Sequence, residues 1–444
     1  MELKKYRRKR EIPIGWKEIK LGDVFRTSSG ATPLTTELSY YEGGNIPWIN
    51  SGELASPYIY STSNYITQKG FDNSSTEIYP KGTILVAMYG ATAGKASMLK
   101  ITACTNQAIC AILPNDDYCP EFIKYNIDTL YEHLVGLSSG SARDNLSQAG
   151  LKELKLVLPK TKKEQENLIV VLSLLDSKIE LNKQINDNLE AMAKQLYDYW
   201  FVQFDFPNEE GKPYKSSGGA MVWNEKLKRE IPQGWHCGTL LDIAEYTNGL
   251  ACQKYRPTDD NKLPVIKIKE MHDGLSTDTE WVRADIPDGI KVFDGDVLFS
   301  WSASLEVMLW AYGNGGLNQH IFKVTSKNGY PRSFYFYQLV HYIGVFKQMA
   351  EARKTTMGHI TQDHLRQSTI ALPPNVNIAN KLEEKLCPIF NAIVKNSQEI
   401  MSITKQRDEL LPLLMNGQAS VNYHLLVNPT TAYLSIRFSQ LFYK

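Results

Sequence analysis

The chain has 444 residues, with 49 lysine and arginine residues against 48 aspartate and glutamate residues, so its formal net charge is +1. This length predicts two or three domains, and a hydrophobic content of 43% excludes wholesale disorder. The neutral balance means that nucleic-acid binding cannot be inferred from bulk charge. The longest apolar run, residues 168–175, is too short to span a bilayer, and no apolar core follows the basic N-terminal residues as in a signal peptide.

Cysteine and histidine spacing excludes two further classes of protein. No CxxC or HxxxH pattern occurs, so a zinc site and a disulfide scaffold are both improbable, and a reducing cytoplasm is expected. The six cysteines are Cys104, Cys110, Cys119, Cys237, Cys252 and Cys387.

One long repeat organises the chain. Residues 10–16 (REIPIGW) return at 229–235 (REIPQGW), 219 residues later. Other segments return at offsets of 212 to 214 residues: 82–90 with 295–303, 105–114 with 317–324, and 146–159 with 360–373. The period is far too long for a solenoid, so one large unit is used twice.

Each copy begins with a segment rich in short apolar runs between turn residues, over about 10–160 and 229–375. Helices are expected at Glu121–His133 and Ser333–Glu351. The runs predict strands, which makes the copy an α+β domain with considerable sheet. The predicted strands lie at 82–90, 108–114, 154–159, 263–269, 295–301 and 368–373.

Each copy closes with a long heptad-patterned segment, which predicts two coiled-coil helices of about 38 residues, or roughly 57 Å. The residues expected on the seam are Leu168, Leu172, Leu175, Ile179, Leu189, Leu196, Leu382, Leu386, Ile389, Ile393, Ile400, Ile403 and Leu410. Because both helices end a copy of one repeat, antiparallel pairing and a pseudo-twofold axis are expected. Two unrelated core helices are the alternative.

Three residues test this pairing. Antiparallel layers would bring Asn186 to Asn396, and a buried asparagine commonly fixes register in a coiled coil. Solvent-facing asparagines are equally compatible with the sequence. Pro388 predicts either a kink in the second helix or a late start of that helix.

Catalytic motifs fail on spacing. The segment 90–97 (GATAGKAS) is one residue short of a phosphate loop and lacks its Ser or Thr. The segment 312–316 (YGNGG) lacks the strand and helix of a dinucleotide site. The segment 371–375 (ALPPN) lacks the acid or amide and the aromatic residue of an amino-methyltransferase loop. These failures favour a non-catalytic chain.

Several segments resemble the specificity subunit of type I restriction–modification systems. The similarity covers about residues 10–418, and 10–25 and 229–244 match the opening of its two domains. The other matching segments are SSGATP (28–33), GGNIPWINSGEL (43–54), MYGATAGKASML (88–99), LYDYWFVQFDFPNEEGKPYKSSGGAMV (196–222), NGLACQKYRP (248–257), LPVIKIKEM (263–271) and FSWSAS (299–304).

The resemblance implies two α/β target-recognition domains joined by two antiparallel helices, each domain reading half of a split DNA site. It also implies that two methyltransferase subunits and two motor-nuclease subunits dock on this chain. S-adenosylmethionine would belong to the methyltransferase partner, and ATP and Mg to the motor partner. The chain itself would hold no metal, cofactor or catalytic residue and would contact no membrane.

The implied boundaries follow the repeat. They are 1–160 for the first target-recognition domain, 161–207 for the central helix, 208–228 for a linker, 229–375 for the second target-recognition domain, 376–418 for the distal helix and 419–444 for an unassigned tail.

Side chains that hydrogen-bond base edges and cations that contact phosphates are the candidates for DNA binding. In the first domain they are Ser28, Ser29, Thr32, Trp48, Asn50, Tyr89, Lys95, Ser141, Arg143 and Asn145. In the second they are Asn248, Gln253, Tyr255, Arg256, Lys267, Lys269, Trp301, Ser302, Lys354 and Thr355. For any one of them a plain turn or core role is as probable. The Asn-Gln pairs at 106–107 and 318–319 are expected to make structural hydrogen bonds inside strands.

Two other functions stay open at this point. A stand-alone DNA-modifying enzyme would methylate DNA as a purified chain. A coiled-coil adaptor that binds only protein would show no salt-dependent binding to any duplex.

Overall fold

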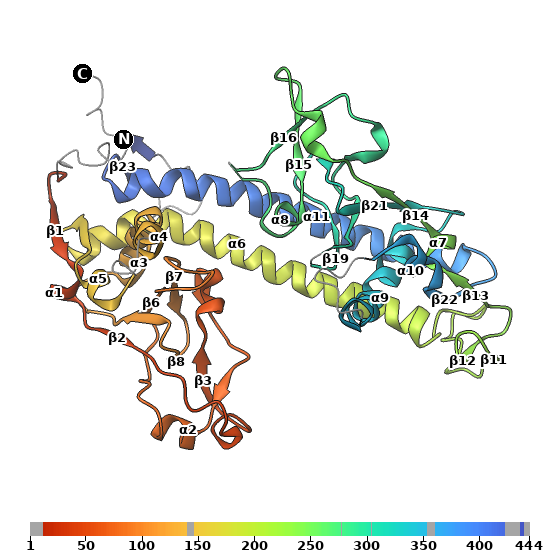
Figure 1. Cartoon of the computed structure of the whole chain (residues 1–444), viewed down its shortest axis with the longest axis horizontal. Coiled ribbons are helices and arrows are strands. Elements are labelled where there is room, and N and C mark those ends of the chain that lie inside the picture. Colours follow the sequence, from red (N-terminus) through yellow and green to blue (C-terminus); the bar gives the residue numbers. More distant parts are fainter. Residues whose placement is uncertain are drawn as a thin grey trace. The chain divides into compact units, whose positions relative to one another are not determined.

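A computed structural model describes residues 12–139, 146–276, 278–302, 304–352, 360–421 and 436–438. They form two compact units: unit 1 lies within 1–176 and 405–444, and unit 2 within 177–404. The long helices α6 (Lys162–Tyr197) and α11 (Asn377–Met415) each contribute a segment to both units (Figure 1).

The main sheet of unit 1 has five strands in the order β2-β9-β6-β7-β4. Its strands are β2 (Thr27–Ser29), β4 (Tyr58–Ile59), β6 (Ile84–Ala87), β7 (Ala96–Leu99) and β9 (Ile109–Ile112). Strands β6, β7 and β9 are buried along their whole length, because alternate residues enter different apolar clusters on the two faces. The continuous apolar runs of the sequence reflect this burial.

Smaller sheets and short helices complete unit 1. A three-stranded sheet has the order β5-β3-β8, β1 pairs with β10, and β23 pairs with β24. These strands are β1 (Trp16–Lys20), β3 (Ile46–Ile49), β5 (Tyr65–Ile66), β8 (Cys104–Thr105), β10 (Lys155–Pro159), β23 (Ala419–Val421) and β24 (Ile436–Phe438). The helices are α1 (Leu21–Val24), α2 (Gln68–Asp72), α3 (Pro120–Asp128), α4 (Tyr131–Ser139) and α5 (Gln148–Lys152).

Unit 2 repeats this frame with sheets β14-β21-β18-β19 and β16-β15-β20-β17, and with the pairs β13-β22 and β11-β12. Its strands are β11 (Met221–Asn224), β12 (Arg229–Pro232), β13 (His236–Thr239), β14 (Ala244–Asn248), β15 (Lys262–Ile266), β16 (Trp281–Arg283), β17 (Lys291–Val292), β18 (Val297–Ser300), β19 (Glu306–Leu309), β20 (Gly315–Leu317), β21 (Ile321–Ser326) and β22 (Thr369–Leu372). The helices are α7 (Leu240–Ile243), α8 (Ile268–Asp273), α9 (Arg332–Ala352) and α10 (Gln362–Gln367).

One glycine in each unit shows how closely the two frames correspond. Gly30 follows β2, and a Cβ there would lie 1.9 Å from the Thr105 carbonyl oxygen. Gly249 follows β14, and its Cβ would lie 2.2 Å from the Asn318 carbonyl oxygen. Only glycine lets the chain pass the neighbouring backbone so closely. The loops that begin at these glycines therefore leave equivalent points of the two frames.

The two long helices pair antiparallel in each unit. In unit 2, Asn396 Nδ2 donates to Asn186 Oδ1 at 3.0 Å, which confirms the predicted partner of Asn186. Asn182 is 2% exposed and donates to Glu399 at 2.8 Å, so it does not face solvent. In unit 1, Arg407 pairs with Asp176 at 3.1 Å. In unit 2, Asn182 contacts Glu399 and Asn186 contacts Asn396, so the residue numbers fall along α11 as they rise along α6, as antiparallel helices require.

The predicted seam residues lie buried or half-buried. The buried ones are Leu172, Ile179, Leu382, Leu386, Ile393 and Ile403, and the half-buried ones are Leu168, Leu175, Leu189, Leu196, Ile389, Ile400 and Leu410. Leu174, Leu181 and Ile185, which lie off the heptad positions of α6, are exposed. Pro388 lies inside α11 on its exposed side, so the predicted late start is wrong.

Three sequence predictions need correction. The helix predicted at 121–133 is two helices, α3 and α4, and the strand predicted at 263–269 ends at Ile266 because 268–273 form α8. The Asn-Gln pairs lie in the turns β8–β9 and β20–β21, not inside strands. The linker boundaries 208–228 stay a prediction; this segment contains β11, and its Tyr214 stacks on Phe206 with ring centroids 4.8 Å apart.

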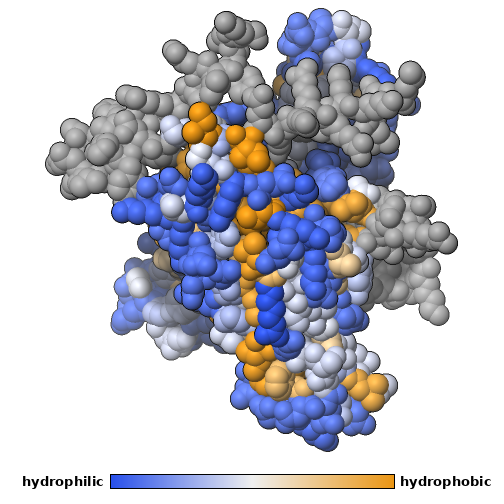
Figure 2. Space-filling view, turned by 90° about the vertical axis from the view of Figure 1, so that its left-hand side faces the viewer, coloured by the Kyte–Doolittle hydropathy of each residue, from blue (hydrophilic) through white to orange (hydrophobic). Residues whose placement is uncertain are grey.

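Hydrophilic residues dominate the face seen in Figure 2, where hydrophobic residues form a narrow, broken band. Within the described ranges, no helix is long and apolar enough to cross a membrane.

Candidate nucleic-acid interface

In unit 1 the first candidate residues lie on β2 and the loop after Gly30. Ser28 Oγ donates to Glu77 Oε1 at 3.1 Å, and the same carboxylate pairs with Arg26 at 2.7 Å. Thr32 Oγ1 donates to Gln107 Oε1 at 2.5 Å. Ser29, the last residue of β2, is half-buried. These short polar side chains form a hydrogen-bonding surface along one edge of the main sheet.

Trp48 and Asn50 support this surface from β3. Trp48 is 8% exposed, and its indole Nε1 donates to the Ala31 carbonyl at 3.0 Å, so its role here is to hold the loop. Asn50 caps the short helix Ser51–Ala55 and accepts a hydrogen bond from Asn106 Nδ2 at 3.4 Å. Asn106 also accepts from the Ala108 amide at 3.1 Å, the structural role predicted for it.

The β6–β7 hairpin brings Tyr89 and Lys95 to the same end of the sheet. Thr92 Oγ1 donates to the Ser51 carbonyl at 2.7 Å, which fixes the hairpin against the short helix that Asn50 caps. Tyr89 is 49% exposed at the tip, where Gly90 adopts a φ of +89°. An exposed aromatic side chain on a tight turn can stack on a base or sugar. Lys95 is half-buried.

In unit 2 the corresponding place is occupied by an amide and an indole. Trp301 Nε1 donates to Asn248 Oδ1 at 3.1 Å. The indole also packs against His320 and Phe322, with ring centroids 5.6 and 5.8 Å away. Ser302 is 5% exposed, so it cannot reach a ligand without a change in the loop. Asn248 itself is exposed.

The loop after Gly249 brings two further candidates of unit 2 to one cavity of about 780 Å³. Gln253 and Arg256 line it and are exposed, and Tyr255 lies between them in sequence, beneath Arg283 at 5.5 Å from its ring. Lys267 instead pairs with Glu280 at 2.5 Å. Because Lys267 and Glu280 neutralise each other, Lys267 is a weaker candidate for phosphate binding than Arg256.

Lys269 does not line this cavity. Lys269 is an exposed residue of α8, and its Nζ lies 3.8 Å from an Asp278 carboxylate oxygen. Ser141, Arg143, Asn145, Lys354 and Thr355 lie outside the described residues.

Two residues of the cavity were missed by the sequence prediction. Trp281 is 46% exposed, and Lys262 lies over its ring with Nζ 5.1 Å from the centroid. They sit on neighbouring strands, with β15 and β16 paired antiparallel. The aromatic-basic alternation of 281–283 (WVR) was the available signal. A cation beside an exposed aromatic face suits both phosphate and base contacts.

The two sets of side chains offer hydroxyl, amide, guanidinium and aromatic groups on loops of a rigid frame, which are the groups that read base edges and contact phosphates. In the part of the chain that the structure describes, no group of three or more His, Cys, Asp or Glu side chains could hold a metal ion. The fold and these surfaces define a duplicated recognition protein built on paired helices.

Comparison with known proteins identifies its family. Residues 13–191 and 232–405 match the family described as the type I restriction modification DNA specificity domain. The type I restriction enzyme MjaIX specificity subunit of Methanocaldococcus jannaschii is 30% identical over 429 residues, which cover 93% of this chain and 95% of the relative. The HindI specificity subunit of Haemophilus influenzae is 23% identical over 472 residues, covering 91% and 99%.

A solved structure supports the fold. The crystal structure of the type I restriction–modification S subunit from M. genitalium has a TM-score of 0.53 at 15% identity, covering 90% of this chain and 96% of that one. The chain therefore belongs to the type I restriction–modification specificity subunits. It is the subunit that determines the DNA target, and it is not a catalytic subunit.

Proposed function

We propose that the chain reads a split DNA target, with one half-site for each recognition domain, and that it carries methyltransferase and motor-nuclease subunits to that target. The observation that carries the proposal is the repetition of one frame with different reading groups. Ser28 and Thr32 occupy the region in unit 1 where Asn248 and Arg256 occupy it in unit 2. Different side chains on one frame are what two different half-sites require.

The chemistry is assigned to the partners. Two methyltransferase subunits would bind S-adenosylmethionine and methylate adenine N6, and two motor-nuclease subunits would use ATP and Mg. The proposed sites on this chain contain the side chains for contacts to DNA, and their role is to select the sequence. A pseudo-twofold relation of the two domains remains a prediction of the sequence repeat.

A domain exchange tests the split site. Residues 30–150 are replaced by the matching part of a relative, beginning at the glycine where the reading loop leaves the frame. Methylation sequencing of host DNA should then show a change in one half of the methylated motif. A change in both halves, or in neither, would contradict the proposal. The chain with its own 30–150 is the control.

Two simpler measurements address the alternative functions. The purified chain, incubated with DNA and labelled S-adenosylmethionine, should incorporate no label above a blank. The assembled complex should bind its methylated motif as a duplex with an affinity that falls steeply as salt rises, since phosphate contacts release counterions. Binding that does not depend on salt would favour the protein adaptor.

A further inference from the structure

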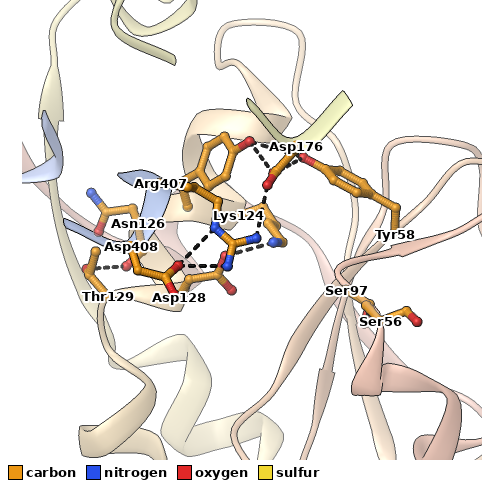
Figure 3. Close-up of polar contacts among 11 residues, drawn as sticks. Ser56, Tyr58, Ser97, Lys124, Asn126, Asp128, Thr129, Asp176, Arg407 and Asp408 are labelled. Atoms are coloured by element: carbon orange, nitrogen blue, oxygen red, sulfur yellow. Dashed lines mark hydrogen bonds and ion pairs between the residues drawn. The ribbon is translucent and has the colours of Figure 1, made fainter. Parts of the chain in front are cut away.

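A single carboxylate in unit 1 joins four elements. Asp176 of α6 is 7% exposed, and it accepts hydrogen bonds from Tyr125 of α3 at 2.6 Å and from Tyr58 of β4 at 3.1 Å. Its other oxygen accepts from Arg407 of α11 at 3.1 Å. Figure 3 shows the side chains of Tyr58 and Arg407 both directed toward Asp176.

The surroundings of Asp176 are charged as well. Lys124, whose side chain is 4% exposed, pairs with Asp128 at 2.8 Å, and Arg407 also pairs with Asp408 at 2.7 Å. Burial, and then the charge of Asp176, raise the pKa of both Tyr58 and Tyr125 well above the ordinary value. Both phenols therefore remain protonated and able to donate at any physiological pH.

Unit 2 places apolar groups at the equivalent positions. Asp176 lies seventeen residues after Pro159, and Phe390 lies seventeen residues after Pro373. Fully buried Phe122 and Leu134 of unit 1 correspond in the same way to fully buried Phe334 and Phe346 of unit 2, 212 residues later.

This alignment pairs Tyr125 with Tyr337, Lys124 with Phe336, and Asp128 with Val340. The rings of Tyr337 and Phe390 then lie 5.9 Å apart, where unit 1 has a phenol and a carboxylate. Phe336 packs edge-on against Phe390 at 5.3 Å.

The contrast indicates that the charged cluster is not needed for stability. Desolvating a buried ion pair costs so much that apolar replacement is often neutral or stabilising. Unit 2 holds the same frame with that apolar arrangement. A cavity of about 530 Å³ lies beside the cluster in unit 1 and is lined by Lys95, Lys124 and Asp176 among others. A cavity of about 610 Å³ lies at the equivalent place in unit 2 and is lined by Phe336, Tyr337 and Phe390 among others. The two junctions therefore differ in polarity: directional hydrogen bonds join the elements in unit 1, and ring contacts join them in unit 2.

Tyr58 links the cluster around Asp176 to the main sheet of unit 1. It lies on β4, the strand that adds a fifth position to the main sheet beside β7. Ser97 Oγ donates to the Ser56 carbonyl at 2.5 Å and holds the start of β4 to the sheet. A rotation of the sheet on its helices would therefore strain the bond between Tyr58 and Asp176.

We propose that Asp176 is a positioning residue for DNA recognition: it fixes the angle at which the first recognition domain sits on its own helices. That angle determines where the first half-site must lie on the DNA. It therefore determines how strongly the complex prefers one length of the unread gap between the half-sites. The inference rests on the proposed function, since a gap exists only in a split target.

Three variants test the inference in the complete complex with its methyltransferase partner. Tyr58→Phe removes one donor and keeps the ring, and Asp176→Asn removes the charge and keeps the size. Tyr337→Phe is the control for loss of a phenol at the other junction, because Tyr337 is the counterpart of Tyr125 and faces Phe390 where Tyr125 faces Asp176. The readout is the ratio of initial methylation rates on duplexes with the native gap and with gaps one base pair longer or shorter. Thermal unfolding of each variant is measured alongside.

The expected result is a preference for the native gap that falls by roughly five- to tenfold in Tyr58→Phe and Asp176→Asn, the scale of one typical intramolecular hydrogen bond. Tyr337→Phe should keep the wild-type preference. If Asp176→Asn does not fold, Tyr58→Phe decides. An unchanged preference in a folded variant, or an equal loss of rate on every gap, would overturn the positioning role. A wild-type complex with no preferred gap would contradict the proposed split site instead.

Discussion

The two units carry one frame but attach it to their helices by different chemistry. In unit 1 the contact is made by Asp176, Arg407 and the phenol of Tyr125, and in unit 2 by Phe390 and the ring of Tyr337. Both arrangements support the same strand order through the centre of the sheets. The difference teaches that sheet pairing and buried apolar strands determine the frame. The residues that join the frame to the helices can differ between the units without changing it.

The units also differ at the margins of their sheets. Strand β4 extends the main sheet of unit 1, whereas in unit 2 the added strand is β17 beside β20. Added strands at an edge leave the central pairings intact, so insertions are tolerated there. The reading loops after Gly30 and Gly249 begin at such margins. The four predictions below test which features each unit needs, and which it can change.

The largest effect is expected from changing the helices where one unit gives way to the other. Two residues inserted after Asp176 in α6 and two after Thr404 in α11 would rotate each helix by about 200° at 3.6 residues per turn. One unit must then expose its seam residues, either Leu172 in unit 1 or Ile179, Leu386 and Ile393 in unit 2. We expect no properly folded chain, measured by thermal unfolding and by the loss of host DNA methylation.

A heptad inserted at the same two places is the matched control. It keeps the seam in phase and leaves every contact inside each unit unchanged. Each helix grows by about 10.5 Å, which corresponds to about three base pairs. Methylation sequencing should find the same half-sites with a wider gap. An unchanged gap, with methylation intact, would show that the helices do not set the spacing.

The second effect is expected at the two glycines that begin the reading loops. Gly30→Ala and Gly249→Ala each force a methyl group onto a carbonyl oxygen and should lower the stability of the affected unit by about 1–3 kcal/mol. In chains that still fold, methylation assays should show weaker selection at one half-site only, and a different one for each variant.

Open glycines provide the controls for this pair. A Cβ on Gly52 of unit 1 or Gly344 of unit 2 would meet no atom within 4 Å. Gly52→Ala and Gly344→Ala should therefore leave the unfolding temperature and both half-sites nearly unchanged. Equal losses in the control variants would mean that the close backbone approach is not the cause.

The third effect concerns the amide layer of unit 2. Asn186 is 8% exposed and bonds both Asn396 and Ser397, so Asn186→Ala leaves polar groups without partners and should cost about 1–3 kcal/mol in denaturant unfolding. Exchanging Asn186 and Asn396 together for leucine should cost less than Asn186→Ala, because no amide is left unpaired. Exposed Asn188→Ala is the control. If the double leucine variant is less stable than Asn186→Ala, the unpaired amide is not the cause of the loss.

The sequence predicted the features that depend on local pattern. Residue spacing along the chain was enough to predict the repeat, the central strands, the helix Arg332–Ala352 and the Asn186–Asn396 pair. Asn248 and Trp301 were both predicted as DNA-binding residues from the sequence, and they are hydrogen-bonded to each other in the structure.

The sequence could not predict features that need contacts far apart in the chain. The donors around Asp176 come from residues 58, 125 and 407, and no local pattern marks a carboxylate at an apolar seam as buried. Lys262 and Trp281 meet only because β15 and β16 pair. Trp48 was a candidate for base contact by residue type, and only its burial reveals a supporting role.

The smallest effect is expected at Glu399, where unit 2 has its own interhelical carboxylate. The amide of Asn182 and then Lys178 hold the pKa of Glu399 below its ordinary value. A lowered pKa adds stability above the unfolded value of about 4.3, and that stability is lost as the pH falls through the folded pKa. Glu399→Gln should therefore lower the unfolding temperature slightly at pH 7, and the difference from wild type should shrink as the pH falls below about 4.3 and vanish once Glu399 is protonated in the folded state. Glu409→Gln on the same helix is the control, and a difference that persists in acid would show that packing, not charge, is responsible.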